Sequence, residues 1–206
     1  MDRGGTAVDE GVDVDPARPM RADAVKNRQR ILDAAAEVFA TSGVSVPIDL
    51  VAARAGVGVG TLYRHFPNKE ALFEAIVLTK VEDLIAQANA ADGADDPVRA
   101  LFAFLQLLAS EAAMKHDLFD ALGSAGIDIK SRCATRIEEL EGGIARLLAR
   151  AVDTGAVRDD LCAHDVMGMV IGMCDAAERL GGDADSVRRM IGVVCEGLRA
   201  RAEESE

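Results

Sequence analysis

Residues 46–66 read VPIDLVAARAGVGVGTLYRHF and contain two short helical patterns on either side of a tight turn. Pro47 suits the first turn of the first helix, because a proline there lacks only an N–H that has no helical partner. Gly56 permits the chain to turn sharply, and Pro67 ends the second helix. Two short helices joined through a glycine predict a helix-turn-helix unit over about residues 47–66.

The apolar residues of this unit predict which side is buried. Those expected to anchor the pair to the preceding helix are Leu50, Val51, Ala53, Val57 and Leu62. The opposite side of the second helix then points outward and carries Val59, Gly60, Thr61, Tyr63, Arg64 and His65. A face that combines small, hydroxyl-bearing and basic residues suits contact with DNA.

The residue types on this face indicate specific contacts. Small residues at the helix start let the backbone approach a phosphate, and the hydroxyls of Thr61 and Tyr63 can donate to phosphate oxygens. Arg64 can bind guanine through two hydrogen bonds or contact a phosphate, and Val59 can contact a thymine methyl group. Lys69, at the start of the next helix, provides a further phosphate contact. The basic surface is completed by Arg21, Lys26, Arg28 and Arg54.

Helical patterns surround this unit on both sides, and no segment alternates as a strand does. Residues 24–42 form an amphipathic helix that Gly43 ends. Its apolar face consists of Val25, Ile31, Leu32, Ala35, Val38 and Phe39. Asn68 is expected to cap a long helix that ends at the loop of residues 91–97. Further helices are predicted at about 97–115, 117–124, 129–154, 163–181 and 184–202, so the fold class is all-α.

The composition of the 206 residues is that of a globular protein, with 50% apolar and 3% aromatic residues. The formal charge of −12 is distributed unevenly. Residues 1–20 carry −3, residues 21–69 carry +3 and residues 70–206 carry −12. The acidic total argues against a protein that coats nucleic acid through bulk charge, whereas the basic block coincides with the helix-turn-helix pattern.

The sequence shows neither a membrane span nor a secretory signal. The longest strictly apolar run of its C-terminal part, residues 166–174, is far shorter than the ~20 residues that cross a bilayer. The acidic N-terminus lacks the basic start and apolar stretch of a signal peptide, so a cytoplasmic location is expected. The cysteines form no Cys-x-x-Cys pair and are predicted to be reduced core thiols: Cys133, Cys162, Cys174 and Cys195.

The segments NRQRILDAAAEVFATSG (residues 27–43) and AARAGVGVGTLYRHFPNKEAL (residues 52–72) resemble the N-terminal domain of TetR-family transcriptional regulators. The resemblance covers about residues 24–80 and rests on the ordered elements A-x-x-A-G-V, G-T-L-Y-x-H-F and K-x-x-L. It implies an all-helical homodimer that binds a palindromic operator and is released when a small ligand enters the C-terminal bundle. We therefore expect no enzyme activity, cofactor or metal ion.

The resemblance also implies roles for individual residues. The positions that hold the DNA backbone correspond to Thr61, Tyr63, His65 and Lys69. The positions that face the bases correspond to Val59, Gly60 and Arg64. The sequence departs from the family pattern at two places. Gly58 stands where Ser or Thr is frequent, which removes a side-chain cap, and Pro47-Ile48 replaces a more polar entry to the first helix.

We predict three segments: a disordered arm over residues 1–20, a TetR-type DNA-binding domain over 21–80 and a ligand-binding and dimerisation domain over 81–206. The last two helices show coiled-coil spacing and are expected to hold the homodimer. Close helix approach there would be permitted by Gly168, Gly172, Gly192 and Gly197. A pocket for a small apolar effector is expected to be lined by Phe102, Leu105, Leu108, Phe119, Met167 and Met173.

A nucleotide-binding protein and a ligand-binding adaptor are two other classes that a glycine-rich, helical sequence can indicate. The glycines at 56, 58 and 60 do not form a nucleotide-binding loop, because no strand precedes them and their spacing is not G-x-G-x-x-G. The alternative function is a helical ligand-binding adaptor without DNA binding. Specific duplex binding that weakens steeply with salt distinguishes a regulator from such an adaptor.

An enzyme with a metal site is a further class. Neither group of possible ligands has the spacing of a helical metal site, and helix-capping or surface roles are favoured. The two groups are His116 and Asp117 with Asp120, and Asp159 and Asp160 with His164 and Asp165.

Overall fold

The computed structural model describes residues 17–113 and 129–200, and every regular element within these ranges is an α-helix. The elements are α1 (Ala17–Ser42), α2 (Ile48–Ala55), α3 (Val59–His65), α4 (Lys69–Ala91), α5 (Pro97–Ala113), α7 (Ile129–Arg132), α8 (Ala134–Val152), α9 (Ala163–Arg179) and α10 (Ala184–Gly197). The predicted all-α fold is confirmed. The expected helix at 117–124 lies outside the described residues.

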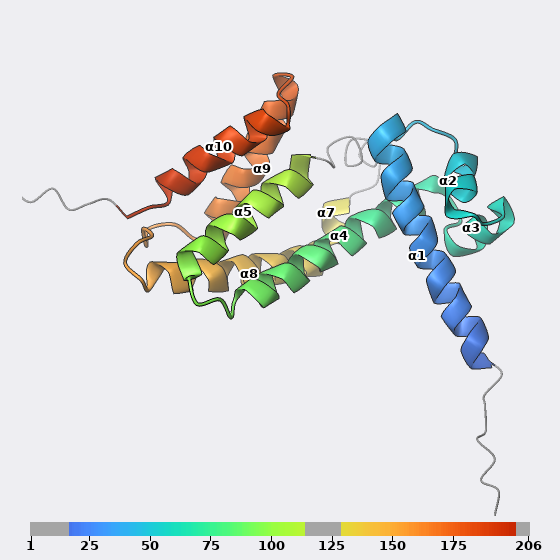
Figure 1. The fold of residues 1–206 in the computed structure, drawn as a ribbon, viewed down its shortest axis with the longest axis horizontal. Coiled ribbons are helices and arrows are strands. Elements are labelled where there is room, and N and C mark those ends of the chain that lie inside the picture. The colour runs from blue at the N-terminus through green and yellow to red at the C-terminus, as the bar shows by residue number, and fades with distance from the viewer. Residues whose placement is uncertain (1–16, 114–128, 201–206) are drawn as a thin grey trace, which may run out of the picture.

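Figure 1 shows α1, α2 and α3 grouped on one side and α5, α8, α9 and α10 on the other, with α4 running between the two groups. None of the helices described is long and apolar enough to cross a membrane. The arrangement agrees with a small N-terminal helical unit that is followed by a larger helical bundle.

Local start and stop signals act as expected at several helix ends. The Oδ1 atom of Asn68 accepts a hydrogen bond from the backbone N–H of Ala71 at 2.8 Å and so caps α4. Gly43 and Gly56 follow α1 and α2 with φ values of 74° and 64°, in the left-handed region that favours glycine. Helix α5 begins at Pro97, the last residue of the predicted loop and the first of the helix predicted at 97–115.

The predicted start of the first helix is wrong. Helix α1 begins at Ala17 rather than at residue 24, so residues 17–20 of the expected disordered arm are helical. Pro19 lies in the first turn, where its missing N–H breaks no helical hydrogen bond. Residues 1–16 of the expected arm lie outside the described part of the chain.

The helix predicted over residues 129–154 is divided in the structure. Cys133 separates α7 from α8 with φ −99° and ψ 6°, and its side chain is only 2% exposed. The break occurs where this buried side chain meets the other part of the molecule.

Buried apolar side chains form two clusters, called here the N-terminal core and the C-terminal core. The N-terminal core contains residues of α1, α2, α3 and the first half of α4, together with Cys133. The C-terminal core contains residues of the second half of α4 and of α5, α8, α9 and α10. Val81 of α4 packs against both clusters. Helix α4 therefore belongs to both cores.

The buried face of α2 differs from the predicted one. The residues it buries are Ile48, Val51, Ala52 and Ala55. Leu50 is 51% exposed and Ala53 is exposed, so the prediction that these two anchor the unit is wrong. The buried positions follow the i, i+3, i+4, i+7 spacing of a single helix face. Positions 50 and 53 lie outside this face, so their side chains are exposed to solvent.

The prediction that Val25 belongs to the buried face of α1 is also wrong. Val25 is 69% exposed, and no residue of the N-terminal core precedes Ile31. Figure 1 shows the reason, because the first part of α1 extends past α2 and α3.

Helix α7 and the start of α8 return to the N-terminal core. Cys133 belongs to that core, and Arg132 forms an ion pair with Glu74 of α4 at 2.5 Å. Ile137 packs against both cores. The two parts of the molecule are therefore joined by this return as well as by α4.

Helices α4 and α8 approach each other closely. A Cβ placed on Gly143 would stand 2.9 Å from the Cβ of Ala88, so only glycine fits there without movement. In the next turn, Arg146 donates to Asn89 at 2.5 Å and pairs with Asp92 at 3.4 Å. The glycine thus sets the spacing, and polar contacts close the exposed edge.

All four cysteines are free thiols, and three of them are buried. Burial raises the pKa of the Cys133, Cys174 and Cys195 thiols. Cys162 is exposed just before α9, so the prediction that it is a core thiol is wrong. Its backbone N–H donates to the carboxylate of Asp165 at 2.9 Å, and this hydrogen bond lowers the pKa of Asp165. The position before a helix, rather than the core, explains its exposure.

We expect Gly143→Ala to lower the free energy of unfolding by about 1–3 kcal/mol, because the new methyl group overlaps Ala88 in a packed interface. Gly142→Ala is the matched control in the same helix. A Cβ there meets only Arg146, at 3.8 Å, and alanine should stabilise the helix by about 0.5–1 kcal/mol. Urea unfolding at equal protein concentration measures both changes. Equal effects of the two variants would contradict the close α4–α8 contact.

A second prediction concerns thiol reactivity. An aromatic disulfide reagent at pH 8 should label one cysteine per chain rapidly, and peptide mass spectrometry should place the label on Cys162. The other thiols should react only after denaturant is added, because burial blocks access and their raised pKa leaves less thiolate. Cys162→Ser should remove the rapid phase. Rapid labelling of Cys174 in the folded protein would show that the C-terminal core admits the reagent, in conflict with the burial of this thiol.

Candidate nucleic-acid interface

Helices α2 and α3 are joined by a turn that depends on glycine. Gly56 follows α2 with φ 64° and ψ 36°, and its N–H donates to the carbonyl oxygen of Ala53 at 3.1 Å. Helix α3 starts after Gly58, whose carbonyl oxygen accepts from the N–H of Thr61 at 2.8 Å. No side chain caps this helix start, as expected for a glycine in that position. The backbone at the start of α3 is therefore open to an approaching group.

Helix α3 buries a single residue, Leu62, and turns most of its other side chains outward. Val59 is 38% exposed and Tyr63 is 45% exposed. The predicted outward residues comprise four exposed ones, Val59, Gly60, Tyr63 and Arg64, and two half-buried ones, Thr61 and His65. The backbone at Gly60 is also accessible, since no atom lies within 4 Å of a Cβ placed there.

Two of the predicted phosphate contacts line the same pocket. Tyr63 of α3 and Lys69 of α4 both face a pocket of about 390 Å³ at the starts of α2 and α4. The remaining lining residues are Ser45, Val46, Pro47, Ile48, Pro67 and Asn68. Tyr63, Lys69 and Ser45 thus line one depression beside α3, and residues of these types suit an anion such as a DNA phosphate.

Lys69 also has a role within the chain. Its Nζ donates to the carbonyl oxygen of Val46 at 2.7 Å and lies over the rings of Phe39 and Phe73, at 5.9 and 5.6 Å from their centroids. An ammonium group has three donors, so the bond to Val46 leaves capacity for a phosphate oxygen. Lys69 therefore connects the loop before α2 to the start of α4 at the rim of the pocket.

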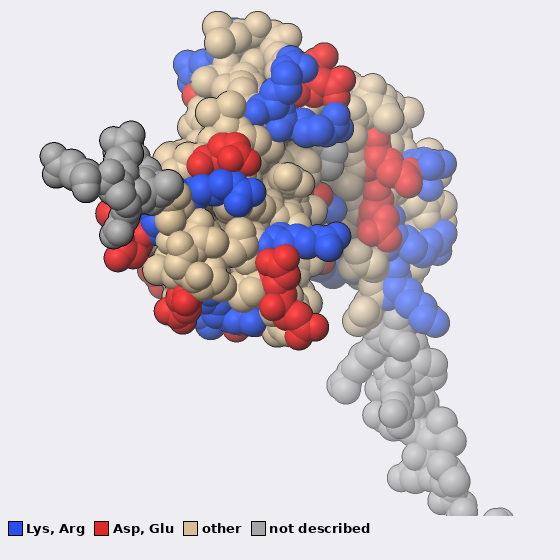
Figure 2. All heavy atoms as spheres, turned by 60° about the vertical axis from the view of Figure 1, so that its left-hand side comes forward, with Lys and Arg blue, Asp and Glu red and all other residues tan. Residues whose placement is uncertain are grey.

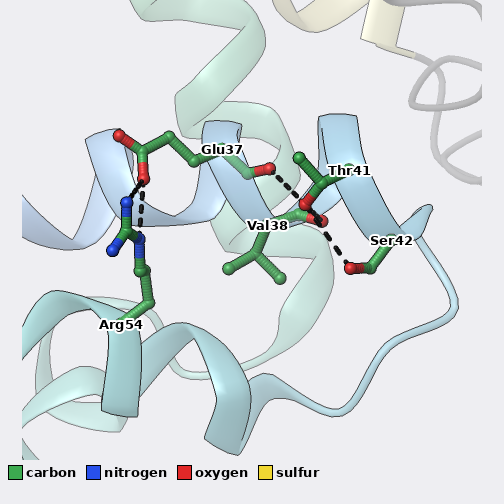
Figure 3. Close-up of polar contacts among 5 residues, drawn as sticks. All are labelled: Glu37, Val38, Thr41, Ser42 and Arg54. Carbon is green, nitrogen blue, oxygen red and sulfur yellow. Dashed lines mark hydrogen bonds and ion pairs between the residues drawn. The ribbon is translucent and has the colours of Figure 1, made fainter.

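Arg54, predicted to contact the DNA backbone, is bound within the chain. Its guanidinium donates to the carboxylate of Glu37 in α1, with Nε 2.7 Å and Nη2 2.5 Å from Oε2 (Figure 3). Both side chains are more than half exposed, so the pair contributes at most about 1 kcal/mol to stability. In Figure 3 the pair joins α1 to α2, while Thr41 bonds to the carbonyl groups of Glu37 and Val38 farther along α1.

Two arginines of α1 reach the helix-turn-helix unit. The Cζ atom of Arg28 lies 5.4 Å from the ring centroid of Phe66, at the end of α3. Nη2 of Arg30 donates to the carbonyl oxygen of Ala55 at 2.7 Å, at the end of α2. Arg30 was not predicted to have a role, because its partner is 25 residues away in the chain and nothing in the local pattern of α1 points to it.

The described basic side chains of residues 21–69 therefore fall into two groups, those that contact other groups of the chain and those that do not contact another described residue. Arg28, Arg30, Arg54 and Lys69 contact other groups of the chain. Lys26 and Arg64 are exposed and form no hydrogen bond, ion pair or ring contact with another described residue. Arg21 lies in α1, and its side chain is outside the described part of the structure.

The surface of the C-terminal part has a different character. Figure 2, which brings this part forward, shows acidic and basic side chains interspersed among uncharged residues, and neither sign dominates the face shown. Ion pairs within single helices contribute to this pattern, as between Arg179 and Asp175 at 3.0 Å. Such a surface lacks the concentrated positive charge that nucleic acid attracts.

The metal-ligand candidates do not assemble into a site in the described residues. No group of three His, Cys, Asp or Glu side chains close enough to hold a metal ion occurs there. His164 is paired with Glu141 at 3.6 Å, and Asp160 binds Arg158. The other candidates, His116, Asp117 and Asp120, lie outside the described residues.

The predicted effector-pocket residues occupy different environments. Leu105, Leu108 and Met167 are buried in the C-terminal core, and Met173 packs against it. Phe102 also packs against this core, and it lines a surface pocket of about 580 Å³ beside Arg99 and Arg199. Phe119 lies outside the described residues. The five described residues of the set therefore all contact the C-terminal core.

Several of the exposed large apolar side chains in the described part of the chain lie on or next to α9 and α10. Ile171 is 50% exposed, Met169 39% and Val193 73%. Leu180, which directly follows α9, is 85% exposed. A Cβ would meet no atom within 4 Å at any of the predicted interface glycines, Gly168, Gly172, Gly192 and Gly197. Packing among the described residues therefore does not require glycine at these helical positions.

Comparison with known families and proteins agrees with this geometry. The profile described as "Bacterial regulatory proteins, tetR family" matches residues 31–76, and "Transcriptional regulator SbtR-like, C-terminal domain" matches residues 96–200. The chain is 26% identical to the HTH-type transcriptional regulator SrpR of Pseudomonas putida over 195 residues, which are 92% of this chain and 84% of SrpR. It is 32% identical to the HTH-type transcriptional repressor KstR of Rhodococcus jostii over 151 residues, 70% of this chain and 69% of KstR.

Solved structures show the same likeness. A TetR transcription regulatory protein from Mycobacterium vanbaalenii superposes with a TM-score of 0.71 at 34% identity, covering 88% of this chain and all of that one. The TetR transcriptional regulator SCO0520 from Streptomyces coelicolor gives a TM-score of 0.69 at 29% identity, covering 85% of this chain and 99% of that one. The helix-turn-helix, the two profiles and these relatives together place the chain in the TetR family, whose members are DNA-binding transcriptional regulators and not enzymes.

Proposed function

We propose that this TetR-family protein is a cytoplasmic repressor that binds a palindromic operator as a homodimer and is released by a small apolar effector. The observation that carries the proposal is the outward face of α3 beside the pocket that Tyr63 and Lys69 share. The similarity to KstR, which is a transcriptional repressor, supports repression over activation.

In this proposal α3 is the recognition helix and lies in the major groove. Val59, Gly60 and Arg64 face base edges, and Arg64 has no competing partner among the described residues. The DNA backbone is held by Thr61, Tyr63, His65 and Lys69, with Arg54 at the edge of the interface. A phosphate in the shared pocket accepts hydrogen bonds from the Tyr63 hydroxyl and from the remaining N–H donors of Lys69.

Basic residues of α1 extend the same surface. Lys26 is exposed and supplies a phosphate contact, and Arg21 and Arg28 lie on the same helix. Because Arg28 stacks on Phe66 and Arg54 pairs with Glu37, their contacts with DNA compete with bonds that exist in the free protein. Their net contribution to affinity is therefore expected to be smaller than that of Arg64.

We further propose that residues 21–80 are the DNA-binding domain and 81–206 the ligand-binding and dimerisation domain. The two cores support this division, since the N-terminal core draws on α1 to α3 and the C-terminal core on α5 and α8 to α10. The boundary falls within α4, near Val81, which touches both. An effector that alters the C-terminal core can thus change the angle of α4, and with it the spacing of the two recognition helices.

The proposed dimer interface is the exposed face of α9 and α10. It presents Ile171 and Val193 on the helices that carry glycines which no contact among the described residues explains. Each glycine in a helix interior costs up to about 1 kcal/mol relative to alanine, so close packing against a second copy would offset that cost. The effector pocket is proposed at Phe102, Leu105, Leu108, Phe119, Met167 and Met173, where methionine can adapt to an apolar ligand.

Duplex binding tests the reading surface. The probes are a duplex that the wild-type protein selects from a random-sequence pool and a shuffled duplex of equal composition. Arg64→Ala should lower affinity for the selected duplex about tenfold or more and relax base preference, because a bidentate base contact contributes about 1–3 kcal/mol. Tyr63→Phe should weaken both duplexes by a similar factor, since it removes only a phosphate donor.

The control for these variants is Arg99→Ala, which removes one exposed positive charge from α5, outside the proposed interface. It should leave duplex affinity unchanged. Selection of no sequence by the wild-type protein, with no salt-dependent duplex binding, would favour an adaptor without DNA binding.

Sedimentation equilibrium tests the dimer interface. Ile171→Glu should weaken self-association at least a hundredfold, because it places a charge in a face that becomes buried. Val25→Glu is the control, since Val25 is an exposed apolar residue on α1, 69% exposed against 50% for Ile171. Monomers of the wild-type protein at micromolar concentration, or equal effects of the two variants, would remove this interface from the proposal.

A further inference from the structure

We propose that Arg30 of α1 is a positioning residue for DNA reading, because its guanidinium holds the turn between α2 and α3 and so sets the pose of α3. The proposal rests on the proposed function of α3 as the recognition helix. It differs from a phosphate-contact role, since Arg30 acts on the backbone of the protein rather than on DNA.

The contact is made at the end of α2. Nη2 of Arg30 donates to the carbonyl oxygen of Ala55 at 2.7 Å and lies 3.5 Å from that of Gly56. Carbonyl groups at a helix C-terminus have no helical partner and form the negative end of the helix dipole. A guanidinium therefore finds both a hydrogen-bond acceptor and a favourable field at this point, and it joins α1 to the turn.

Two features of the structure favour glycine at position 56. Its φ of +64° is in the left-handed region, which other residues rarely adopt. A Cβ at this position would also stand 2.8 Å from Nη2 of Arg30, too close for both to remain. A side chain at 56 would push the guanidinium away from the carbonyl groups. The turn is thus shaped to admit Arg30 as well as to reverse the chain.

Helix α3 needs such support because little of it is buried. It has seven residues, and Leu62 is the only buried one. Arg30 fixes the chain just before α3, and Arg28 stacks on Phe66 just after it, with Cζ 5.4 Å from the ring centroid. The two arginines of α1 therefore hold the recognition helix near both of its ends.

This role predicts a distinctive binding signature. A lost phosphate contact weakens selected and unselected duplexes alike and reduces the salt slope by about 0.9. A tilted recognition helix loses its base contacts but keeps its nonspecific ones, so the ratio of the two affinities falls. The ratio is the readout, and a change in overall stability alone does not alter it when the protein is folded.

The first experiment compares Arg30→Met with Lys26→Met in the full chain, using the selected and shuffled duplexes at several salt concentrations. Arg30→Met should lower the specificity ratio about tenfold, in line with one charge-assisted hydrogen bond, and leave binding to the shuffled duplex within about twofold. Arg30→Lys keeps a cationic donor and should recover part of the ratio. Lys26→Met, which removes a charge from the same helix, should weaken both duplexes equally.

The second experiment uses the two turn glycines as a matched pair. Gly43 has φ +74° and no atom within 4 Å of a Cβ, whereas Gly56 has φ +64° and Arg30 within 2.8 Å. Gly43→Ala and Gly56→Ala introduce the same kind of backbone strain, but only Gly56→Ala should displace Arg30 and lower the specificity ratio. In the Arg30→Met background, Gly56→Ala should lower the ratio no further than Gly43→Ala does. Circular dichroism confirms that each variant is folded at the assay temperature.

The outcomes separate this proposal from the proposed function. Equal weakening of both duplexes by Arg30→Met, with a reduced salt slope, would make Arg30 a phosphate contact and overturn the positioning role. An unchanged ratio in Gly56→Ala, relative to Gly43→Ala, would overturn it as well. Failure of the wild-type protein to prefer any duplex would instead overturn the proposed function of α3.

Discussion

The structure depends on one helix that is shared by two hydrophobic cores. Helix α4 buries Leu72 and Phe73 among α1 to α3, and it buries Leu84 and Ala88 among α5 and α8. A buried apolar surface is rigidly packed, so a change in the direction of α4 must alter the packing of both cores. The return of α7 to the N-terminal core, with Cys133 buried there, adds a second connection. The two parts are therefore connected by packing at two places.

A second theme is the use of positive charge within the N-terminal unit. In an acidic chain, a basic block suggests a surface kept free for DNA, but most of its described side chains bind the protein itself. Arg30 holds the turn, Arg54 joins α2 to Glu37, and Lys69 binds the loop before α2. Helices α2 and α3 are short, and α3 buries only Leu62, so these polar links help to fix the pair on α1 and α4. Positive charge in this unit therefore links its helices to one another, while Lys26 and Arg64 have no such contact with another described residue.

The elements of the fold follow from local signals, and these were predicted correctly where the signal was strong. The turn at Gly56, the cap at Asn68 and the outward face of α3 all derive from residues within one or two helical turns. Exposure was predicted less well. Leu50 and Cys162 were expected in the core because they are apolar, yet α2 turns Leu50 away from α1, and Cys162 stands before α9. An apolar residue has no preference for a particular neighbour, so its burial depends on how whole elements pack.

Local signals in the sequence were therefore sufficient to establish the helical fold class, the helix-turn-helix unit and the family to which the chain belongs, because turn glycines, caps and apolar periods act over short distances. The partner that each charged side chain binds depends instead on how the helices pack. Arg30 and Ala55 are 25 residues apart, and Arg132 meets Glu74 across 58 residues, so no local pattern connects them. Such pairs form when α1 and α7 are packed beside the helices they contact, and the division of the basic block into internal links and free contacts is a consequence of that packing.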